Sequence, residues 1–172
     1  MAEASLDTYV KLGYSVIYGS GLTMPALPPF DPDGLLPLGD SELSLAELRE
    51  SILVSGPGGP AAYPSWDRPW RERLVHNLGT LTHQLWQVGV REIFADGSFA
   101  EDQDHPNDID GYFVCDLKEL RTGELERKLN LLDPSKVWTW DPASRKPYRG
   151  YPKKQLPLYG QPACLLAPCG AD

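Results

Sequence analysis

The chain has 172 residues, of which 41% are hydrophobic and 23% charged, so it can bury the core of one globular domain and is no disordered chain. Its formal net charge of -8 argues against broad, nonspecific binding to nucleic acid. The sequence has no apolar run long enough for a membrane helix, and its start, Met1-Ala2-Glu3, lacks the features of a signal peptide.

The three cysteines indicate a reducing environment. Cys115, Cys164 and Cys169 are odd in number, and no two of them form the close pair that is typical of a metal site. Reduced thiols are the natural interpretation, and such thiols are usual in the cytosol. We therefore expect a cytoplasmic protein that does not enter the membrane.

The N-terminal part, residues 1–60, is expected to be an extended, proline-rich segment with one short helix. Prolines punctuate residues 1–40, which should lie extended over a core rather than form one. A capping box at Ser44 to Glu47 predicts the start of the helix. The glycines and prolines of residues 55–60 then predict a linker.

The central part, residues 61–141, contains the strongest periodicity. Asp67 is a plausible N-cap, and Gly89 stands where a helix commonly ends. One apolar stripe runs between them, formed by Trp70, Leu74, Leu78, Leu81, Leu85 and Val88. Strands are predicted at residues 90–95, 109–115 and 137–140, and a short helix at 125–132. This order predicts an α/β (α+β) fold, with a small mixed sheet flanked by helices.

The residues with the clearest chemistry lie around the first two of these strands. A strand runs into Gly97-Ser98, a turn-rich segment follows, and Asp108-Ile109-Asp110 opens the next strand. Because side chains alternate along a strand, Asp108 and Asp110 should project together. Adjacent carboxylates repel, and Mg²⁺ in proteins is usually held by one or two carboxylates plus phosphate oxygens of a substrate. The pattern therefore predicts a site for Mg²⁺ or Mn²⁺.

Gly97 and Ser98 favour a phosphate next to this metal. Glycine lets the backbone approach a ligand closely. Ser98 and Glu101 form a second capping box, which predicts a helix that begins at Ser98 and whose N-terminus suits a phosphate. Asp96 could be a third acid, although it fits better as a partner for the loop that follows the strand.

Gly-Ser followed by Asp-x-Asp at a strand start resembles the signature of the polymerase-β nucleotidyltransferase superfamily, especially the minimal nucleotidyltransferases of bacterial toxin–antitoxin and defence loci. Residues 96–99 and 106–111, with the segment 30–39, are similar to a bacterial family of uncharacterised nucleotidyltransferase-like proteins, over roughly residues 27–154. The resemblance implies a nucleotidyltransferase-like fold and Mg²⁺-dependent transfer of a nucleotide from an NTP such as ATP to a hydroxyl acceptor. Asp108 and Asp110 would hold the metal, and Gly97 and Ser98 the triphosphate.

The acceptor is left open by the sequence, and so is activity itself. A protein, an RNA end or a small molecule could accept the nucleotide. Active members of the superfamily use a third carboxylate from a later strand, for which Asp141 is the candidate. The tail, residues 142–172, turns basic and then rich in proline and glycine, without a periodic strand. The alternative is a non-catalytic module of the same fold that binds a nucleotide or a partner protein in an antitoxin-like role.

Several other patterns have simpler explanations. Gly19-Ser20 with Asp31-Pro32-Asp33 repeats the motif, but proline between the acids cannot donate to a sheet ladder. The basic run in residues 145–154 is interpreted as a solvated loop, with a triphosphate or RNA contact as the alternative. His76 and His83 are expected to be partly buried polar residues, and His105 could touch a substrate.

Overall fold

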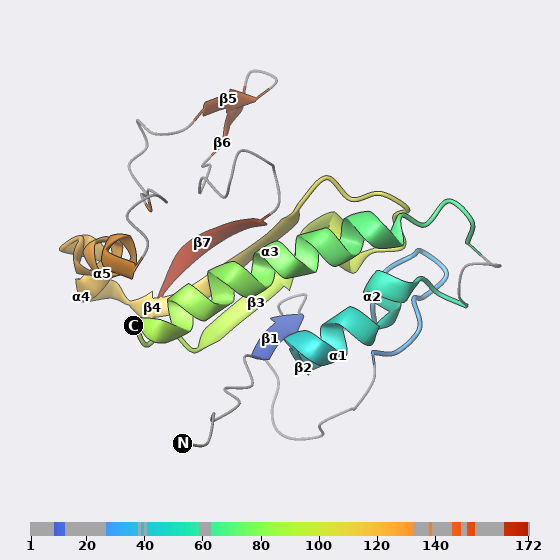
Figure 1. Ribbon diagram of the computed structural model, residues 1–172, viewed down its shortest axis with the longest axis horizontal. Helices are drawn as coiled ribbons and strands as arrows, with labels where there is room; N and C mark the ends of the chain where they lie inside the picture. The colour runs from blue at the N-terminus through green and yellow to red at the C-terminus, as the bar shows by residue number, and fades with distance from the viewer. Residues whose placement is uncertain are drawn as a thin grey trace.

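The computed structural model describes residues 9–12, 27–37, 39, 41–58, 63–132 and 138, and the backbone of three further strands at 146–148, 151–153 and 164–171. Its centre is a five-stranded sheet with helices against it (Figure 1). The strands lie in the order β2-β1-β3-β4-β7. Their bounds are Tyr9–Leu12 (β1), Ser41–Ser44 (β2), Glu92–Asp96 (β3), Ile109–Asp116 (β4) and Cys164–Ala171 (β7).

The sheet is mixed, which confirms the predicted fold class. β1 runs antiparallel to β2 and parallel to β3, β3 runs antiparallel to β4, and β4 runs parallel to β7. β5 (Lys146–Tyr148) and β6 (Tyr151–Lys153) pair with each other in a separate antiparallel hairpin. The described chain is therefore an α+β protein with one mixed sheet.

The tail contradicts the expectation that it holds no strand. β7 pairs with β4 along its whole length, from Ile109 opposite Cys164 to Asp116 opposite Ala171. Strand formation depends strongly on the neighbouring strand, and local sequence is a weaker guide to it. The glycine and proline content of residues 164–171 thus concealed it.

The helices begin and end at the residues that cap them. α1 (Leu45–Glu50) starts at the predicted capping box, with Ser44 and Glu47 bonding each other's main-chain N–H. α3 (Arg68–Gln87) starts at Asp67, whose side chain accepts from the N–H of Trp70. The remaining helices are α2 (Ile52–Ser55), η1 (Gly97–Ala100), α4 (Leu117–Arg121) and α5 (Glu124–Leu132).

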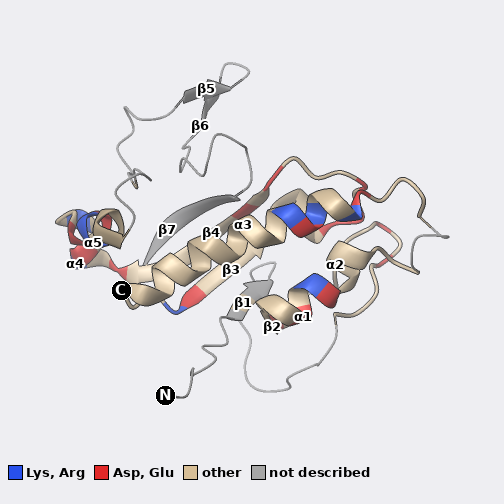
Figure 2. Ribbon diagram, in the orientation of Figure 1, with Lys and Arg blue, Asp and Glu red and all other residues tan. Residues whose placement is uncertain are grey.

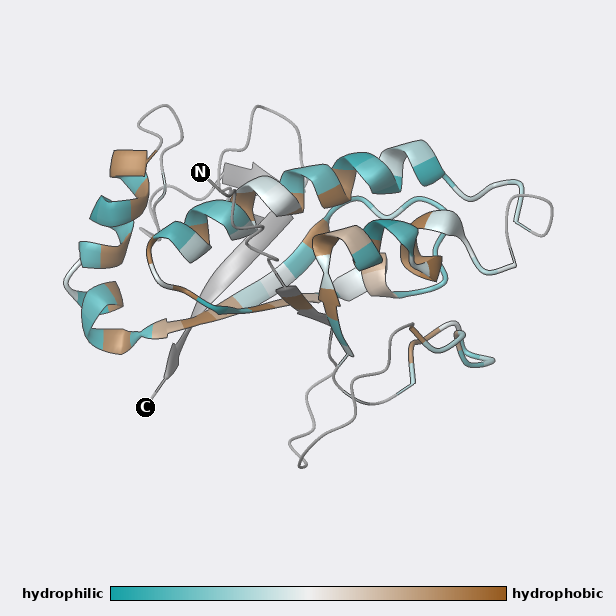
Figure 3. Ribbon diagram, turned by 60° about the horizontal axis from the view of Figure 1, so that its bottom comes forward, coloured by the Kyte–Doolittle hydropathy of each residue, from teal (hydrophilic) through white to brown (hydrophobic). Residues whose placement is uncertain are grey.

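The core lies between α3 and one face of the sheet (Figures 1 and 3). The leucines of the α3 stripe are buried against the inward residues of β3 and β4, namely Ile93, Ala95, Ile109 and Phe113. Val10 of β1 is also fully buried, between β2 and β3 in the sheet. Val10 and Leu27 therefore form part of the core, against the expectation that residues 1–40 only lie over it.

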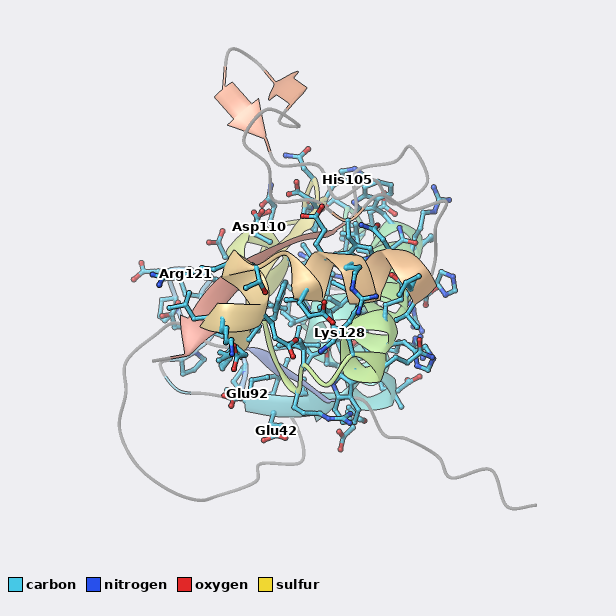
Figure 4. All side chains as sticks on the ribbon, turned by 90° about the vertical axis from the view of Figure 1, so that its left-hand side faces the viewer. Glu42, Glu92, His105, Asp110, Arg121 and Lys128 are labelled. Carbon is cyan, nitrogen blue, oxygen red and sulfur yellow. The ribbon has the colours of Figure 1, made fainter. Side chains whose placement is uncertain are left out.

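The other face of β3 and β4 carries a different set of side chains. Strand alternation places six residues there, which we call the carboxylate face: Glu92, Phe94, Asp96, Asp110, Tyr112 and Val114. Figure 4 shows Asp110 and Glu92 on one side of the ribbon and α3 on the other. The sheet thus has one face devoted to the core and one that meets solvent at Asp110 and Glu92.

Within the described part of the chain, no helix has the length and apolar character needed to cross a membrane. The strand predicted at residues 137–140 falls outside the described residues except for Trp138. This tryptophan is buried and belongs to no strand, and its indole N–H donates to the side chain of Gln84 in α3.

Candidate functional site

Two acids face each other across β3 and β4. Asp96, the last residue of β3, lies directly opposite Asp110 of β4 in the antiparallel register, so both side chains lie on the carboxylate face. Asp110 is exposed and Asp96 is half-buried. Sequence reasoning assigned Asp96 to the loop, and its carboxylate does accept a hydrogen bond from the N–H of Gly97 at 2.7 Å. The pairing of β3 with β4 also makes Asp96 a neighbour of Asp110.

Gly97 brings the main chain against Asp110. Its φ is +76°, a conformation that side chains with a Cβ rarely adopt. A Cβ at this position would stand 3.0 Å from Oδ2 of Asp110 and 3.1 Å from its Cβ. At Gly97 the main chain therefore lies close to the Asp110 carboxylate, and the predicted approach to a bound phosphate stays a prediction.

Asp108 and Ser98 differ from what the sequence predicts, Asp108 in its burial and Ser98 in its secondary structure. Asp108 lies one residue before β4 and is buried, with 6% of its surface exposed, whereas Asp110 is exposed. Ser98 begins no helix, because the element here is a single 3₁₀ turn that starts at Gly97 and is capped by Asp96. The expectation of a helix N-terminus at Ser98 is thus wrong, since the preceding aspartate satisfies the first N–H.

Arg71 of α3 fixes the loop that joins Asp96 at the end of β3 to Asp110 at the start of β4, which we call the site loop. Its side chain is fully buried. It donates to the main-chain carbonyls of Phe99 at 2.8 Å, Glu101 at 3.3 Å and Gln103 at 2.5 Å. A fourth bond, to the carbonyl of Leu53 at 2.7 Å, ties the same guanidinium to α2. One side chain therefore holds α2, α3 and the site loop together.

The environment of Arg71 is compatible with a charged guanidinium. Burial lowers its pKa to about 10, against the opposing effect of Asp102 and Asp104, so Arg71 remains protonated at neutral pH. Its guanidinium carbon lies 3.9 Å from the ring centroid of Trp66. Sequence reasoning missed this residue, although an arginine three positions before Leu74 on a buried helix face was a visible signal.

Further contacts fix the loop near Asp108. The indole N–H of Trp70 donates to the carbonyl of Pro106 at 2.6 Å, and the ring of His105 stacks on Trp70 with centroids 5.0 Å apart. Nδ1 of His105 lies 2.8 Å from Oδ2 of Asp67. The N–H of Trp70 and then His105 lower the pKa of Asp67. Figure 2 shows that the charged residues of α3 gather at this N-terminal end.

The segment before α1 holds the loop from its other side. Leu35 forms an isolated β-bridge with Glu101, and the N–H of Asp102 donates to the carbonyl of Gly34 at 2.8 Å. Asp31 in turn accepts from the N–H of Leu35. These residues belong to the segment 30–39 that resembled the bacterial family, and their place in the structure is beside the site.

Next to the two acids, the carboxylate face carries an aromatic pair. Phe94 lies opposite Tyr112, and their rings are stacked with centroids 4.6 Å apart and planes 10° apart. Both side chains are partly exposed. Sequence reasoning did not single out this pair, because only the register of β3 against β4 brings the two rings together.

The remaining predicted residues are not brought to this place. Asp141 lies outside the described residues. The basic run at 145–154, which was expected to be a solvated loop, contains the hairpin of β5 and β6 instead. His76 and His83 are exposed on α3 rather than partly buried, and His83 bonds Gln87. Among the described side chains, no group of three or more potential ligands is arranged to hold a metal ion.

The chemistry of the donor set nevertheless suits a hard divalent cation. Carboxylate oxygens are the ligands that Mg²⁺ prefers, and one or two of them suffice when a substrate supplies phosphate oxygens. Here Asp110 is exposed, Asp96 faces it, and glycine keeps the space beside the Asp110 carboxylate clear of a side chain. The residues present thus fit a metal that is shared with a phosphate.

Comparison with known proteins gives one result. Residues 28–150 match a family described as a "Family of unknown function (DUF6932)". No curated protein and no solved structure matches the chain.

Proposed function

Since the chain belongs to this family of unknown function, its activity has to be inferred from the site, and we propose that it is a Mg²⁺-dependent nucleotidyltransferase. The observation that carries the proposal is the placement of Asp96 opposite Asp110, with Gly97 against the Asp110 carboxylate. Like charges directly opposite each other destabilise a sheet. A divalent cation bound with a triphosphate would remove this repulsion.

Each residue has a defined task in this proposal. Asp108 and Asp110 would hold Mg²⁺, or Mn²⁺ in its place, with Asp96 opposite Asp110, and the metal would supply neutralisation of charge on the triphosphate. Gly97 and Ser98 would hold the triphosphate, and Gly97 adds no side chain beside the Asp110 carboxylate. Arg71 keeps the intervening loop in place through its carbonyl contacts. Phosphoryl-type transfer asks mainly for such positioning and for neutralisation of charge.

The reaction itself is a displacement at the α-phosphorus. The acceptor hydroxyl oxygen forms a bond to this phosphorus, and the bond to the bridging oxygen of the β-phosphate breaks. Pyrophosphate leaves with that electron pair, and the hydroxyl proton passes to water or to a carboxylate of the site. The acceptor is a protein, an RNA end or a small molecule. We place the reaction in the cytoplasm, in keeping with the reduced cysteines expected from the sequence.

A second function is favoured by the strand next to β4. The position beside Asp110 on β7 is Leu165, so this strand offers no acid there. Asp141 stays the candidate third carboxylate. Without a third acid, the same site would bind Mg²⁺ and nucleotide, or a partner protein, without turnover, as in an antitoxin-like module. A gene for a small helical RNase toxin beside this one would support that function.

Ligand-dependent unfolding tests the site. NTP with Mg²⁺ should raise the melting temperature, because a ligand that binds only the native state stabilises it, by about 2.7 kcal/mol at a hundred times its Kd. We expect Asp108→Asn with Asp110→Asn to abolish this shift. As a matched control, Asp102→Asn with Asp104→Asn removes two charges from the neighbouring loop and should keep it. An equal shift in the wild type and the site variant would remove the assignment.

Activity is then measured separately from binding. The protein is incubated with labelled NTPs, Mg²⁺ and cell extract, and the labelled acceptor is identified. Loss of labelling in Asp141→Asn, with NTP affinity retained, would identify the third carboxylate. Clear Mg²⁺-dependent NTP binding without transfer to any acceptor would favour the non-catalytic module.

A further inference from the structure

The stacked pair of Phe94 and Tyr112 lies next to the two acids along β3 and β4, on the carboxylate face. The register sets Phe94 opposite Tyr112 and Asp96 opposite Asp110, so the ring pair precedes the acid pair by two residues along β3. At the rise of an antiparallel strand, the two pairs are about 7 Å apart. Both rings are partly exposed. The carboxylate face therefore presents two carboxylates and, beside them, an accessible aromatic surface.

We propose that Phe94 and Tyr112 bind the nucleobase of the NTP, an inference that rests on the proposed function of the neighbouring acids. In a nucleotide, one sugar separates the phosphates from a planar base. A triphosphate and its metal at Asp110 would therefore place the base within reach of the aromatic pair. Stacking on an aromatic ring suits any base, because every base has a π-face.

The alternative is that the pair serves the sheet alone. Aromatic side chains opposite each other stabilise antiparallel strands without any ligand. That explanation predicts that the protein binds a bare triphosphate as well as it binds an NTP. Binding of the base predicts that the two ligands differ, and that the difference depends on the rings.

The test compares Mg²⁺-ATP with Mg²⁺-tripolyphosphate, which has the phosphates and no base, by calorimetry. Wild type should bind ATP about tenfold or more tightly than tripolyphosphate, the gain expected from base stacking. Phe94→Leu and Tyr112→Leu should each remove most of this preference and leave the affinity for tripolyphosphate unchanged. Tyr112→Phe keeps the ring and should keep the preference. Val114→Ala, on the same face beyond the pair, is the control.

The outcomes separate the two proposals. Equal affinities of wild type for the two ligands, with binding still dependent on Asp108 and Asp110, would overturn the base site and leave the proposed function standing. Failure of both ligands to bind would end both proposals. Unchanged preference in the leucine variants, with altered transfer to an acceptor, would overturn the assignment to the NTP.

A series on the wild type keeps the inference testable if a leucine variant does not fold. Affinities for ATP, GTP, CTP and UTP should all exceed that for tripolyphosphate, with the purines ahead because they stack over a larger area. Affinities no higher than that for tripolyphosphate across the series would contradict the base site without any variant.

Discussion

At Gly97, both the backbone conformation and the packing require a residue without a Cβ. The φ of +76° costs any other residue about 1–2 kcal/mol, and a Cβ would meet the Asp110 carboxylate at 3.0 Å. We therefore expect Gly97→Ala to lower the free energy of unfolding by at least this backbone cost and to abolish the Mg²⁺-NTP shift in melting temperature.

Gly123 provides the control for this prediction. Its φ is +74°, nearly that of Gly97, but a Cβ there would have no atom within 4 Å. Gly123→Ala should lose a similar backbone contribution and retain the full Mg²⁺-NTP shift. Urea unfolding and thermal shift on both variants separate the conformational cost from the effect on the site. A full shift in Gly97→Ala would show that the contact with Asp110 is unimportant for binding.

At the scale of the element, β3 and β4 set Asp96 against Asp110, and a double-mutant cycle measures their interaction. Such a cycle isolates the pair from the other partners of each residue. With Asp96→Asn and Asp110→Asn, we expect an unfavourable coupling of about 0.2–1 kcal/mol without divalent cations, because like charges lie opposite each other. Mg²⁺ with NTP should abolish this coupling or reverse its sign. Coupling that is favourable in EDTA would contradict this account.

The elements that carry local signals were predictable. The caps of α1 and α3, the apolar stripe of α3, and the strands β3 and β4 follow from residues close together in the chain. β1, β2 and β7 were missed, because strands of this kind are specified by partners far away in the sequence, and the hairpin of β5 and β6 was interpreted as a loop. In such segments, pairing with neighbouring strands outweighs the intrinsic strand propensity of the residues.

The site was predictable in its residue types and less so in its geometry. Gly97 and Asp110 were identified from the motif, and the structure brings them into contact. The helix at Ser98 was not formed, because the capping pattern at Ser98 and Glu101 competes with Asp96, two residues earlier. Arg71 and the aromatic pair emerged only from the fold, since their partners are main-chain carbonyls and a cross-strand ring.

At the scale of the whole molecule, Arg71 connects parts of the chain that are remote in sequence. Replacing it with methionine leaves buried carbonyl oxygens without a donor, at about 1–3 kcal/mol each. We expect Arg71→Met to lower the free energy of unfolding by at least about 3 kcal/mol. Arg73→Met, an exposed position on the same helix, should change it by no more than about 0.5 kcal/mol. Urea unfolding measures both, and similar losses would refute the role of Arg71.

The positions of β1 and β7 in the sheet can be compared with the residues that the family match covers. The match covers residues 28–150, which include β2, β3 and β4 but neither β1 nor β7. β1 lies between β2 and β3, and β7 borders β4. A fragment cut at these limits would have a vacant slot inside its sheet and an unprotected edge along β4. Unpaired strand edges recruit strands from other chains. The boundary of sequence similarity is therefore not a boundary at which this polypeptide could be divided without exposing strand edges.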